Sequence, residues 1–146
     1  MIIGKNKNSI DSKNRICIPH KFRGDFGGRC ILTKDFLDDC LNLYPIDAWE
    51  EFCEKIEKLP SVQMRRMRQL VYSNSDEVEI DSQGRIILNQ NLAGDVGLLN
   101  EKEAMIIGNK TFAQIWNVSK WEEFDAALNA KDSKESVIND LLEMGF

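Results

Sequence analysis

Two five-residue segments of the chain, Asp11–Arg15 and Asp81–Arg85, place an acidic and a basic side chain four positions apart. A guanidinium fixed at the base of a rigid loop can bind a phosphate or a guanine through two parallel hydrogen bonds. The same guanidinium can instead form an ion pair with the aspartate of its own segment, which contributes about 0–1 kcal/mol at a protein surface. The residue types leave both roles open, and one arginine can perform both.

The fourth residue of each segment predicts its backbone conformation. This residue is Asn14 in the first segment and Gly84 in the second, the two residue types that best tolerate a positive φ. We therefore expect a tight hairpin with a left-handed residue just before the arginine. Asp11 and Asp81 are expected to accept backbone N–H hydrogen bonds across the turn, as Asx residues do. Each segment is thus predicted to form an exposed hairpin tip that ends in arginine.

Both tips belong to a tandem repeat. An offset of 70 residues aligns positions 10–27 with 80–97, and eight of those 18 pairs are identical. Farther along, an offset of 72 aligns the Trp-Glu-Glu-Phe of residues 49–52 with the same four residues at 121–124. Two matching blocks in the same order indicate a duplication. Because no Pro-, Gly- or Ser-rich linker separates the copies, we expect them to pack as one unit.

Each copy is predicted to consist of short strands followed by a closing helix. Strands beyond the tips are expected at residues 15–18, 30–33, 40–44, 85–88, 104–108 and 112–116. In the closing helices, Trp49 and Phe52 of the first copy recur at helical spacing, as do Trp121 and Phe124 of the second. We interpret these aromatic stripes as part of the core rather than as ligand sites.

Two more helices and two helix caps are predicted. Ser61 is expected to cap a connecting helix with a basic exposed side, which consists of Arg65, Arg66 and Arg68. A last helix over residues 133–143 is expected to carry an apolar stripe, which consists of Val137, Ile138, Leu141 and Leu142. Ser119 and Glu122 are expected to form a capping box at the start of the second closing helix.

Charge is unevenly distributed along the chain. The whole sequence has 24 acidic and 19 basic residues and a formal net charge of -5, which on its own argues against a nucleic-acid partner. Residues 1–29 nevertheless have a net charge of +5, and residues 61–75 have +3. Because physiological salt screens exposed charges beyond about 8 Å, a basic segment can present a local positive face. The alternative is that these Lys and Arg side chains are scattered over solvated loops.

The residue types that enzymes and metal sites need are sparse. The cysteines have no close pair of the kind that binds zinc, and the chain has one histidine. No Ser-His-Asp or Cys-His spacing is present, so we expect no enzyme activity, cofactor, metal or small-molecule substrate. We expect a cytoplasmic protein without a membrane span or signal peptide. The cysteines, expected to be reduced and buried, are Cys17, Cys30, Cys40 and Cys53.

Several short motifs resemble the MraZ family. They are the two tips, the opening Met1–Gly4, Ile18–Pro19, Tyr44–Pro45 and Ile115–Trp116. The likeness covers residues 1–128 and implies an α+β fold that is mainly β, namely a double AbrB-like swapped-hairpin β-barrel with flanking helices. The implied barrel is a pseudo-twofold tandem repeat that assembles into a ring. Its implied parts are SpoVT-AbrB repeats over 1–60 and 76–130, a connecting basic helix over 61–75 and a C-terminal helix over 131–146.

The resemblance also implies a function. It implies a bacterial transcriptional regulator, usually a repressor, of the division and cell-wall gene cluster in which the protein is encoded. Such proteins bind double-stranded DNA at short direct repeats upstream of their own operon and are associated with the nucleoid. The DNA contacts that the resemblance places on the two tips are Lys13, Arg15, Gln83 and Arg85. The side chains expected to contact phosphates without regard to sequence are Lys5, Lys7, Lys21 and Arg23.

The chain departs from the family pattern after the second tip. Residues 19–23 of the first copy include Lys21 and Arg23, whereas the matching residues 89–93 carry no positive charge. We therefore expect replacement of Arg85 to weaken DNA binding less than replacement of Arg15. Two alternative functions remain open, an AbrB-like antitoxin whose C-terminal helix contacts a toxin, and a structural ring or adaptor protein without DNA readout.

Overall fold

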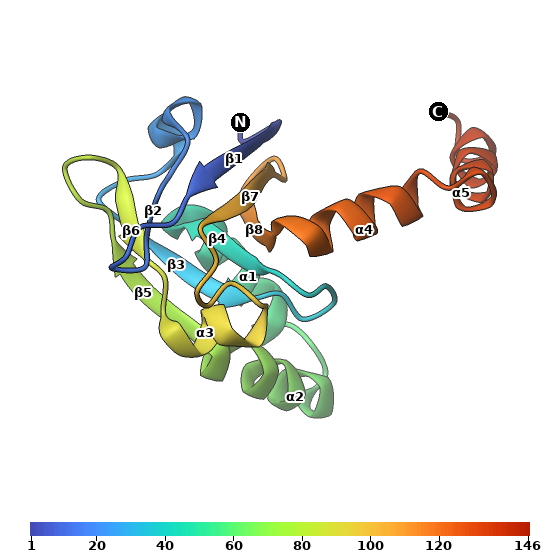
Figure 1. Ribbon diagram of the computed structural model, residues 1–146. Coiled ribbons are helices and arrows are strands. Elements are labelled where there is room, and N and C mark those ends of the chain that lie inside the picture. The colour runs from blue at the N-terminus through green and yellow to red at the C-terminus, as the bar shows by residue number, and fades with distance from the viewer.

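The computed structural model describes residues 1–146 and has eight strands in two antiparallel sheets (Figure 1). In chain order the strands are β1 (Lys5–Ser9), β2 (Arg15–Cys17), β3 (Arg29–Lys34), β4 (Leu41–Pro45), β5 (Ser75–Glu79), β6 (Arg85–Ile87), β7 (Glu103–Gly108) and β8 (Ala113–Asn117). Six of them form one sheet in the order β1-β7-β8-β4-β3-β5, and β2 pairs with β6 in a separate two-stranded ribbon. Together with the helices, these sheets confirm the predicted α+β class.

Five α-helices and two short 3₁₀ helices flank the sheets. They are η1 (His20–Asp25), α1 (Ile46–Glu57), α2 (Ser61–Val71), η2 (Tyr72–Asn74), α3 (Gln90–Asp95), α4 (Val118–Leu128) and α5 (Lys131–Glu143). Helix α1 packs on β3 and β4, and α4 packs in the same way on β7 and β8. Figure 1 shows that α4 and α5 project away from the sheets, so these two helices form an arm.

The strand order shows how the two copies of the repeat combine. Strands β1 to β4 of the first copy correspond to β5 to β8 of the second. Replacing each strand of the six-stranded sheet by its equivalent in the other copy gives the order β5-β3-β4-β8-β7-β1, which is the observed order read backwards. A pseudo-twofold axis therefore relates the two copies. The first strand of each copy pairs with the third strand of the other, β1 with β7 and β5 with β3. The tandem repeat is confirmed, whereas the division of the chain at residues 60, 75 and 130 stays a prediction.

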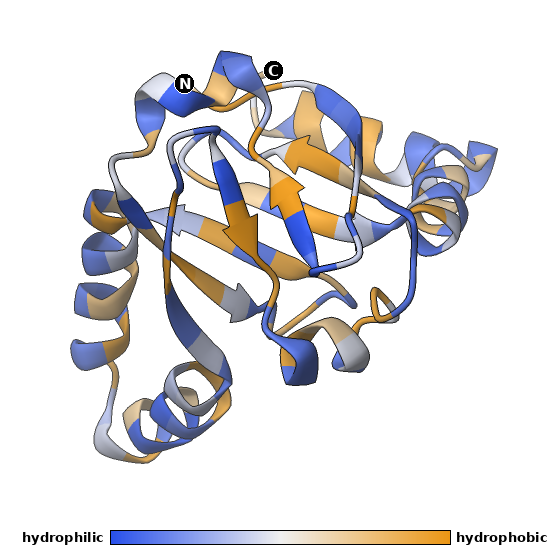
Figure 2. Ribbon diagram, turned by 60° about the vertical axis from the view of Figure 1, so that its left-hand side comes forward, coloured by the Kyte–Doolittle hydropathy of each residue, from blue (hydrophilic) through white to orange (hydrophobic).

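The core lies between the β2–β6 ribbon and the six-stranded sheet, and both copies contribute to it. The ribbon pairs Ile16 with Ile86, and each of these side chains is 1% exposed. Figure 2 shows the two strands running in opposite directions in front of the larger sheet. Because side chains alternate along a strand, the other ribbon residues point to the outer face. These residues are Arg15, Cys17, Arg85 and Ile87.

The predicted helix caps were wrong. Asn117 caps α4, and its side-chain oxygen accepts a hydrogen bond from the backbone N–H of Lys120 at 3.0 Å. Ser119 already lies inside that helix, where its backbone cannot adopt the extended conformation of a cap. Ser61 is likewise the first helical residue of α2, and Pro60 precedes it without a side-chain cap.

The aromatic stripes of the closing helices lie against the two central strands of the larger sheet, β4 and β8. Trp49 and Phe52 of α1 contact the buried Tyr44, each with 5.6 Å between ring centroids. The equivalent group in the second copy consists of Trp116, Trp121 and Phe124. The helical members of both groups are half-buried, so the interpretation as core holds only for the faces turned toward the sheet. On α5, the exposed members of the predicted apolar stripe are Val137, Ile138 and Leu142.

The cysteines correct a second expectation. Cys30 and Cys40 are buried, but Cys17 and Cys53 are only half-buried. Cys17 lies on the outer face of the ribbon and Cys53 lines a hollow beside α1, so neither is enclosed by the core. All four side chains are free thiols.

Candidate nucleic-acid interface

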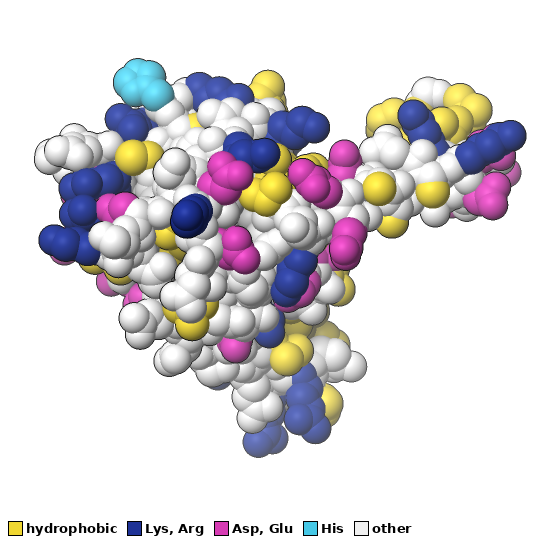
Figure 3. Space-filling model, viewed as in Figure 1, with side chains coloured by type: hydrophobic (Ala, Val, Ile, Leu, Met, Phe, Trp, Pro, Cys, Tyr) yellow, Lys and Arg dark blue, Asp and Glu magenta, His cyan; other side chains and the backbone are white.

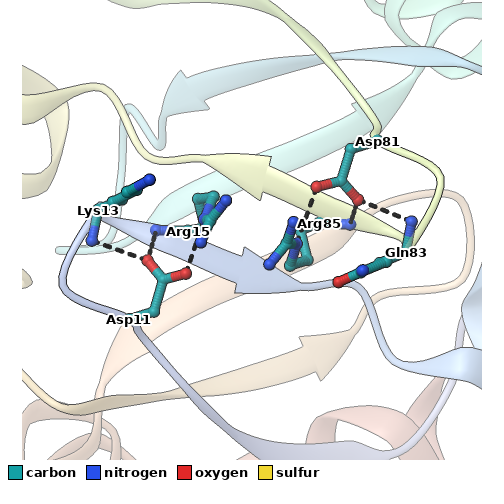
Figure 4. A network of polar contacts seen from close by, with 6 residues as sticks. All are labelled: Asp11, Lys13, Arg15, Asp81, Gln83 and Arg85. Atoms are coloured by element: carbon teal, nitrogen blue, oxygen red, sulfur yellow. Dashed lines mark hydrogen bonds and ion pairs between the residues drawn. The ribbon is translucent and has the colours of Figure 1, made fainter.

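Each hairpin tip is closed by its own aspartate, as Figure 4 shows. Asp11 Oδ1 accepts hydrogen bonds from the backbone N–H groups of Lys13 and Arg15, each at 2.9 Å. Asp11 Oδ2 accepts a further hydrogen bond from Arg15 Nε at 2.7 Å. The second tip repeats the three contacts on Asp81, at 2.9, 2.9 and 2.8 Å. The predicted Asx hydrogen bonds are therefore confirmed, and so is the ion pair within each tip.

The backbone of both tips has the predicted left-handed residue. Asn14 has a φ of 62° and Gly84 has a φ of 77°. The strands on either side of a tip, however, form no continuous hairpin. Only a single bridge, between Ile10 and Ile16, joins the segments that flank the first tip. Beyond that bridge β1 and β2 enter different sheets, because each finds its partner strand in the other copy.

Both aspartates are held in their charged form. The backbone N–H of Arg15 has the largest effect and lowers the pKa of Asp11. Desolvation, the next largest effect, raises this pKa, but the Arg15 side chain and the Lys13 N–H add to the lowering, which prevails. The same groups of the second tip lower the pKa of Asp81. Because an anionic carboxylate accepts hydrogen bonds from both the backbone and the guanidinium, the arginine and the loop form one rigid unit at neutral pH.

An acid titration followed by carboxyl-carbon NMR should place the pKa of both aspartates below the ordinary value of 3.8. An aspartate whose pKa is lower in the folded than in the unfolded chain stabilises the fold at pH values above the ordinary pKa. This contribution to the free energy of unfolding is lost as the pH falls through the lower, folded-state pKa. In Arg15→Ala the pKa of Asp11 should stay below 3.8, because the backbone donors remain. A return to 3.8 in this variant would show that the guanidinium, not the backbone, holds the carboxylate.

The two tip arginines lie on one exposed face. Arg15 and Arg85 are diagonal neighbours on the outer side of the ribbon, an arrangement in which two residues are about 7–8 Å apart and their Cβ atoms somewhat closer. Their side chains are 28% and 26% exposed. In each, only Nε bonds to the aspartate, which leaves the two terminal nitrogens for a ligand. Figure 4 shows both side chains between the two tips, which lie at opposite ends of the antiparallel ribbon.

The other predicted contacts lie at the tips, on β1 and in η1. On β1, Asn8 faces the ribbon and donates a hydrogen bond to the Cys17 carbonyl at 2.7 Å, so by alternation Lys5 and Lys7 project to the opposite face of the larger sheet. Lys13 and Gln83 are exposed at the tips, and Lys5 and Lys7 are exposed on β1, the edge strand that leads into the first tip. Lys21 and Arg23 lie in η1. Figure 3 shows Lys and Arg side chains gathered along the edge of the molecule where β2, β6 and the tips lie, whereas acidic side chains are more frequent toward the arm.

Comparison with known proteins identifies the family. The model of a family described as "MraZ protein, putative antitoxin-like" matches residues 1–70 and again residues 71–143. The chain belongs to the MraZ family. It is 38% identical to the transcriptional regulator MraZ of Clostridium tetani (strain Massachusetts / E88) over 148 residues, covering 100% of both chains. It is 37% identical to that of Acetivibrio thermocellus, also over 100% of both, and 40% identical to that of Clostridium acetobutylicum over 86% of this chain and 87% of the relative.

The MraZ match confirms the resemblance and extends it. The sequence motifs cover residues 1–128, whereas the second match continues to residue 143, through α5. Each MraZ repeat therefore contains a second helix, α2 in the first copy and α5 in the second. The relatives are named as transcriptional regulators, so the chain is a member of a family of regulators, which is not a class of enzyme.

Sequence reasoning missed the contacts that cross between the MraZ repeats. The N–H of Ile18 donates a hydrogen bond to the carbonyl of Gly84, and the N–H of Leu88 donates one to the carbonyl of Asn14, both at 2.8 Å. The segment that follows each tip thus lies beside the tip of the other copy. The only signal for this exchange in the sequence is the repeat itself, because the partners are 66 and 74 residues apart.

No group of three or more His, Cys, Asp or Glu side chains is placed to hold a metal ion. None of the helices combines the length and apolar character that crossing a membrane requires.

Proposed function

We propose that this MraZ family member is a transcriptional regulator that binds double-stranded DNA through the outer face of the β2–β6 ribbon. The observation that carries the proposal is the paired display of Arg15 and Arg85. Each guanidinium is fixed at Nε by its own aspartate and presents its remaining N–H groups outward. A two-stranded ribbon fits the major groove of B-DNA, and an arginine can bind O6 and N7 of guanine in parallel.

The proposed contacts divide into two kinds. The side chains of the tips read bases, and these are Arg15, Arg85, Lys13 and Gln83. Further cations, on β1 and in η1, neutralise phosphates and set the position of the protein on the duplex. These phosphate contacts are Lys5, Lys7, Lys21 and Arg23. The acidic net charge of the whole chain is compatible with this role, because residues 1–29 have a net charge of +5 and salt screens more distant exposed charges.

The target and assembly follow from the family resemblance. We propose that the protein acts in the cytoplasm at the nucleoid, as a repressor of the bacterial division and cell-wall gene cluster. It binds short direct repeats upstream of its own operon as a ring oligomer. A ring presents one ribbon per subunit, so several modest contacts on successive repeats add up to tight binding. The arm supports self-association, because α5 carries exposed apolar side chains that the rest of the chain leaves uncovered.

The function is tested by titrating the DNA directly upstream of the gene with the protein and following fluorescence anisotropy. A duplex of the same composition with scrambled repeats is the control. We expect tight binding to the natural duplex, weak binding to the control, and several chains bound per duplex. Equal affinity for both duplexes would contradict sequence-specific binding and favour a structural ring or adaptor.

Salt dependence measures the phosphate contacts. The logarithm of the binding constant should fall linearly with the logarithm of salt concentration, with a slope of about 0.9 for each phosphate neutralised. Lys7→Ala should lower the slope by about one contact per bound subunit and weaken binding to natural and scrambled duplexes alike. Lys55→Ala, which removes an exposed cation of α1 that is not among the proposed contacts, is the control and should leave the slope unchanged. An unchanged slope in Lys7→Ala would remove this residue from the interface.

A further inference from the structure

The exchange of segments between copies changes which cations accompany each tip. Residues 18–25, which include η1, extend past the second tip, and residues 88–95, which include α3, extend past the first. In the sequence the basic segment follows the first tip, but in the structure it accompanies the second. The weaker DNA binding expected of Arg85 assumed that each tip lies beside the segment that follows it in the sequence. In the structure each tip lies beside the segment that follows the other tip.

Arg23 lies directly against the second tip. Its Nε donates a hydrogen bond to the carbonyl of Ile18 at 3.1 Å, which turns the guanidinium toward Gly84. A Cβ atom placed on Gly84 would lie 2.5 Å from Arg23 Cζ and closer still to Arg23 Nε. The glycine therefore serves two purposes, because it adopts the left-handed φ of the turn and leaves room for the guanidinium. Arg23, Asp81 and Gly84 also share the lining of one hollow of about 170 Å³.

The first tip has a different arrangement at the equivalent place. The residue equivalent to Arg23 is Ala93, which is 0% exposed. The residue equivalent to Gly84 is Asn14, and its side-chain amide donates a hydrogen bond to the carbonyl of Leu88 at 3.4 Å. Leu88 is equivalent to Ile18, whose carbonyl accepts the hydrogen bond from Arg23. The Asn14 side chain therefore occupies at the first tip the position that the Arg23 guanidinium occupies at the second.

The charges of the two tips become equal once Arg23 is included. In the first tip the ion pair of Asp11 and Arg15 is neutral, and Lys13 adds one positive charge. In the second tip the ion pair is also neutral, but Gln83 stands where the first tip has lysine. Arg23 restores the missing charge from the other copy. Lys21, the second cation of η1, does not contribute here, because its Nζ lies toward Gly4, with 2.8 Å to a Cβ placed there.

We propose that Arg23 completes the second tip as a DNA phosphate-binding site, so that both tips contact DNA with similar strength. This inference rests on the proposed function and names a binding residue and its ligand, a backbone phosphate beside the bases that Gln83 and Arg85 face. An arginine suits the site, because its planar guanidinium is held at Nε and can bind a phosphate through its remaining N–H groups.

A double-mutant cycle tests this placement. Arg23→Ala is made in the natural protein, in Arg15→Ala and in Arg85→Ala, and each is titrated with the upstream duplex. Arg23→Ala should weaken binding to natural and scrambled duplexes alike and lower the salt slope by about one per subunit. Its effect should shrink in the Arg85→Ala background and persist in full in Arg15→Ala. Lys21→Ala is the matched control from the same 3₁₀ helix, and its effect should add to that of Arg85→Ala.

Gly84→Asn tests the same contact without removing a cation. Asparagine adopts the left-handed conformation at position 14, so the turn should persist, which circular dichroism checks. The new side chain should displace the Arg23 guanidinium and weaken binding as much as Arg23→Ala does. We also expect Arg85→Ala and Arg15→Ala to lower affinity equally, within about threefold.

Three results would overturn the inference alone: coupling of Arg23 to Arg15 instead of Arg85, unchanged affinity in folded Gly84→Asn, or a clearly smaller loss in Arg85→Ala than in Arg15→Ala. If the natural protein binds neither duplex at low salt, the proposed function fails, and this inference fails with it.

Discussion

Replacing both Arg15 and Arg85 with alanine is expected to abolish sequence-specific DNA binding while the chain stays folded. A bidentate arginine–guanine contact discriminates against the wrong base by about 1–3 kcal/mol. One replacement should therefore lower the affinity for the natural repeats by about 5- to 150-fold, and the pair should reduce it to that for scrambled DNA. Fluorescence anisotropy measures both affinities. The fold should survive, because both side chains are partly exposed and their aspartates keep the backbone hydrogen bonds.

Arg15→Lys with Arg85→Lys is the matched control for charge. Lysine keeps the positive charge but lacks the planar fork, so non-specific binding and its salt slope should remain while discrimination between duplexes falls. Natural affinity in the double alanine variant, with a native circular dichroism spectrum, would show that the outer face of the ribbon does not read DNA.

Replacing Ile86 with alanine is expected to lower the free energy of unfolding by about 2–5 kcal/mol. Ile86 is 1% exposed and pairs with Ile16 across the ribbon, so the truncation leaves a cavity between the ribbon and the six-stranded sheet. Urea denaturation followed by circular dichroism measures the change. The loss should be accompanied by weaker DNA binding, because the packing of Ile86 holds the strand that presents Arg85.

Ile87→Ala is the control for that experiment. Ile87 is the next residue along the same strand, but it lies on the outer face and is 60% exposed. Its truncation should change the free energy of unfolding by no more than about 0.5 kcal/mol. Equal losses in Ile86→Ala and Ile87→Ala would contradict the register of the ribbon, since a shift of one residue exchanges the two faces.

The tips are the part of the site that the sequence predicted best. Aspartate, a residue that tolerates positive φ and arginine lie within five positions, so the hydrogen bonds that form the turn connect near neighbours. Short-range turn chemistry needs little help from the rest of the chain. The helix caps were predicted less well, because several residues near a helix start can act as a cap. Asn117 was favoured by its position at the end of β8.

The sequence by itself determined the duplication, the strands and helices of each copy, and the two arginine-bearing turns, because these depend on local patterns and on the similarity of one segment to another. Only the tertiary structure decided which strands pair and which flank lies beside which tip. The strand pairings between the copies join residues that are 42 to 102 positions apart. A hairpin paired within its own copy has the same local pattern as one exchanged with the other copy. The exchange places Arg15 and Arg85 on one face and moves Arg23 from the tip that it follows to the tip that it contacts.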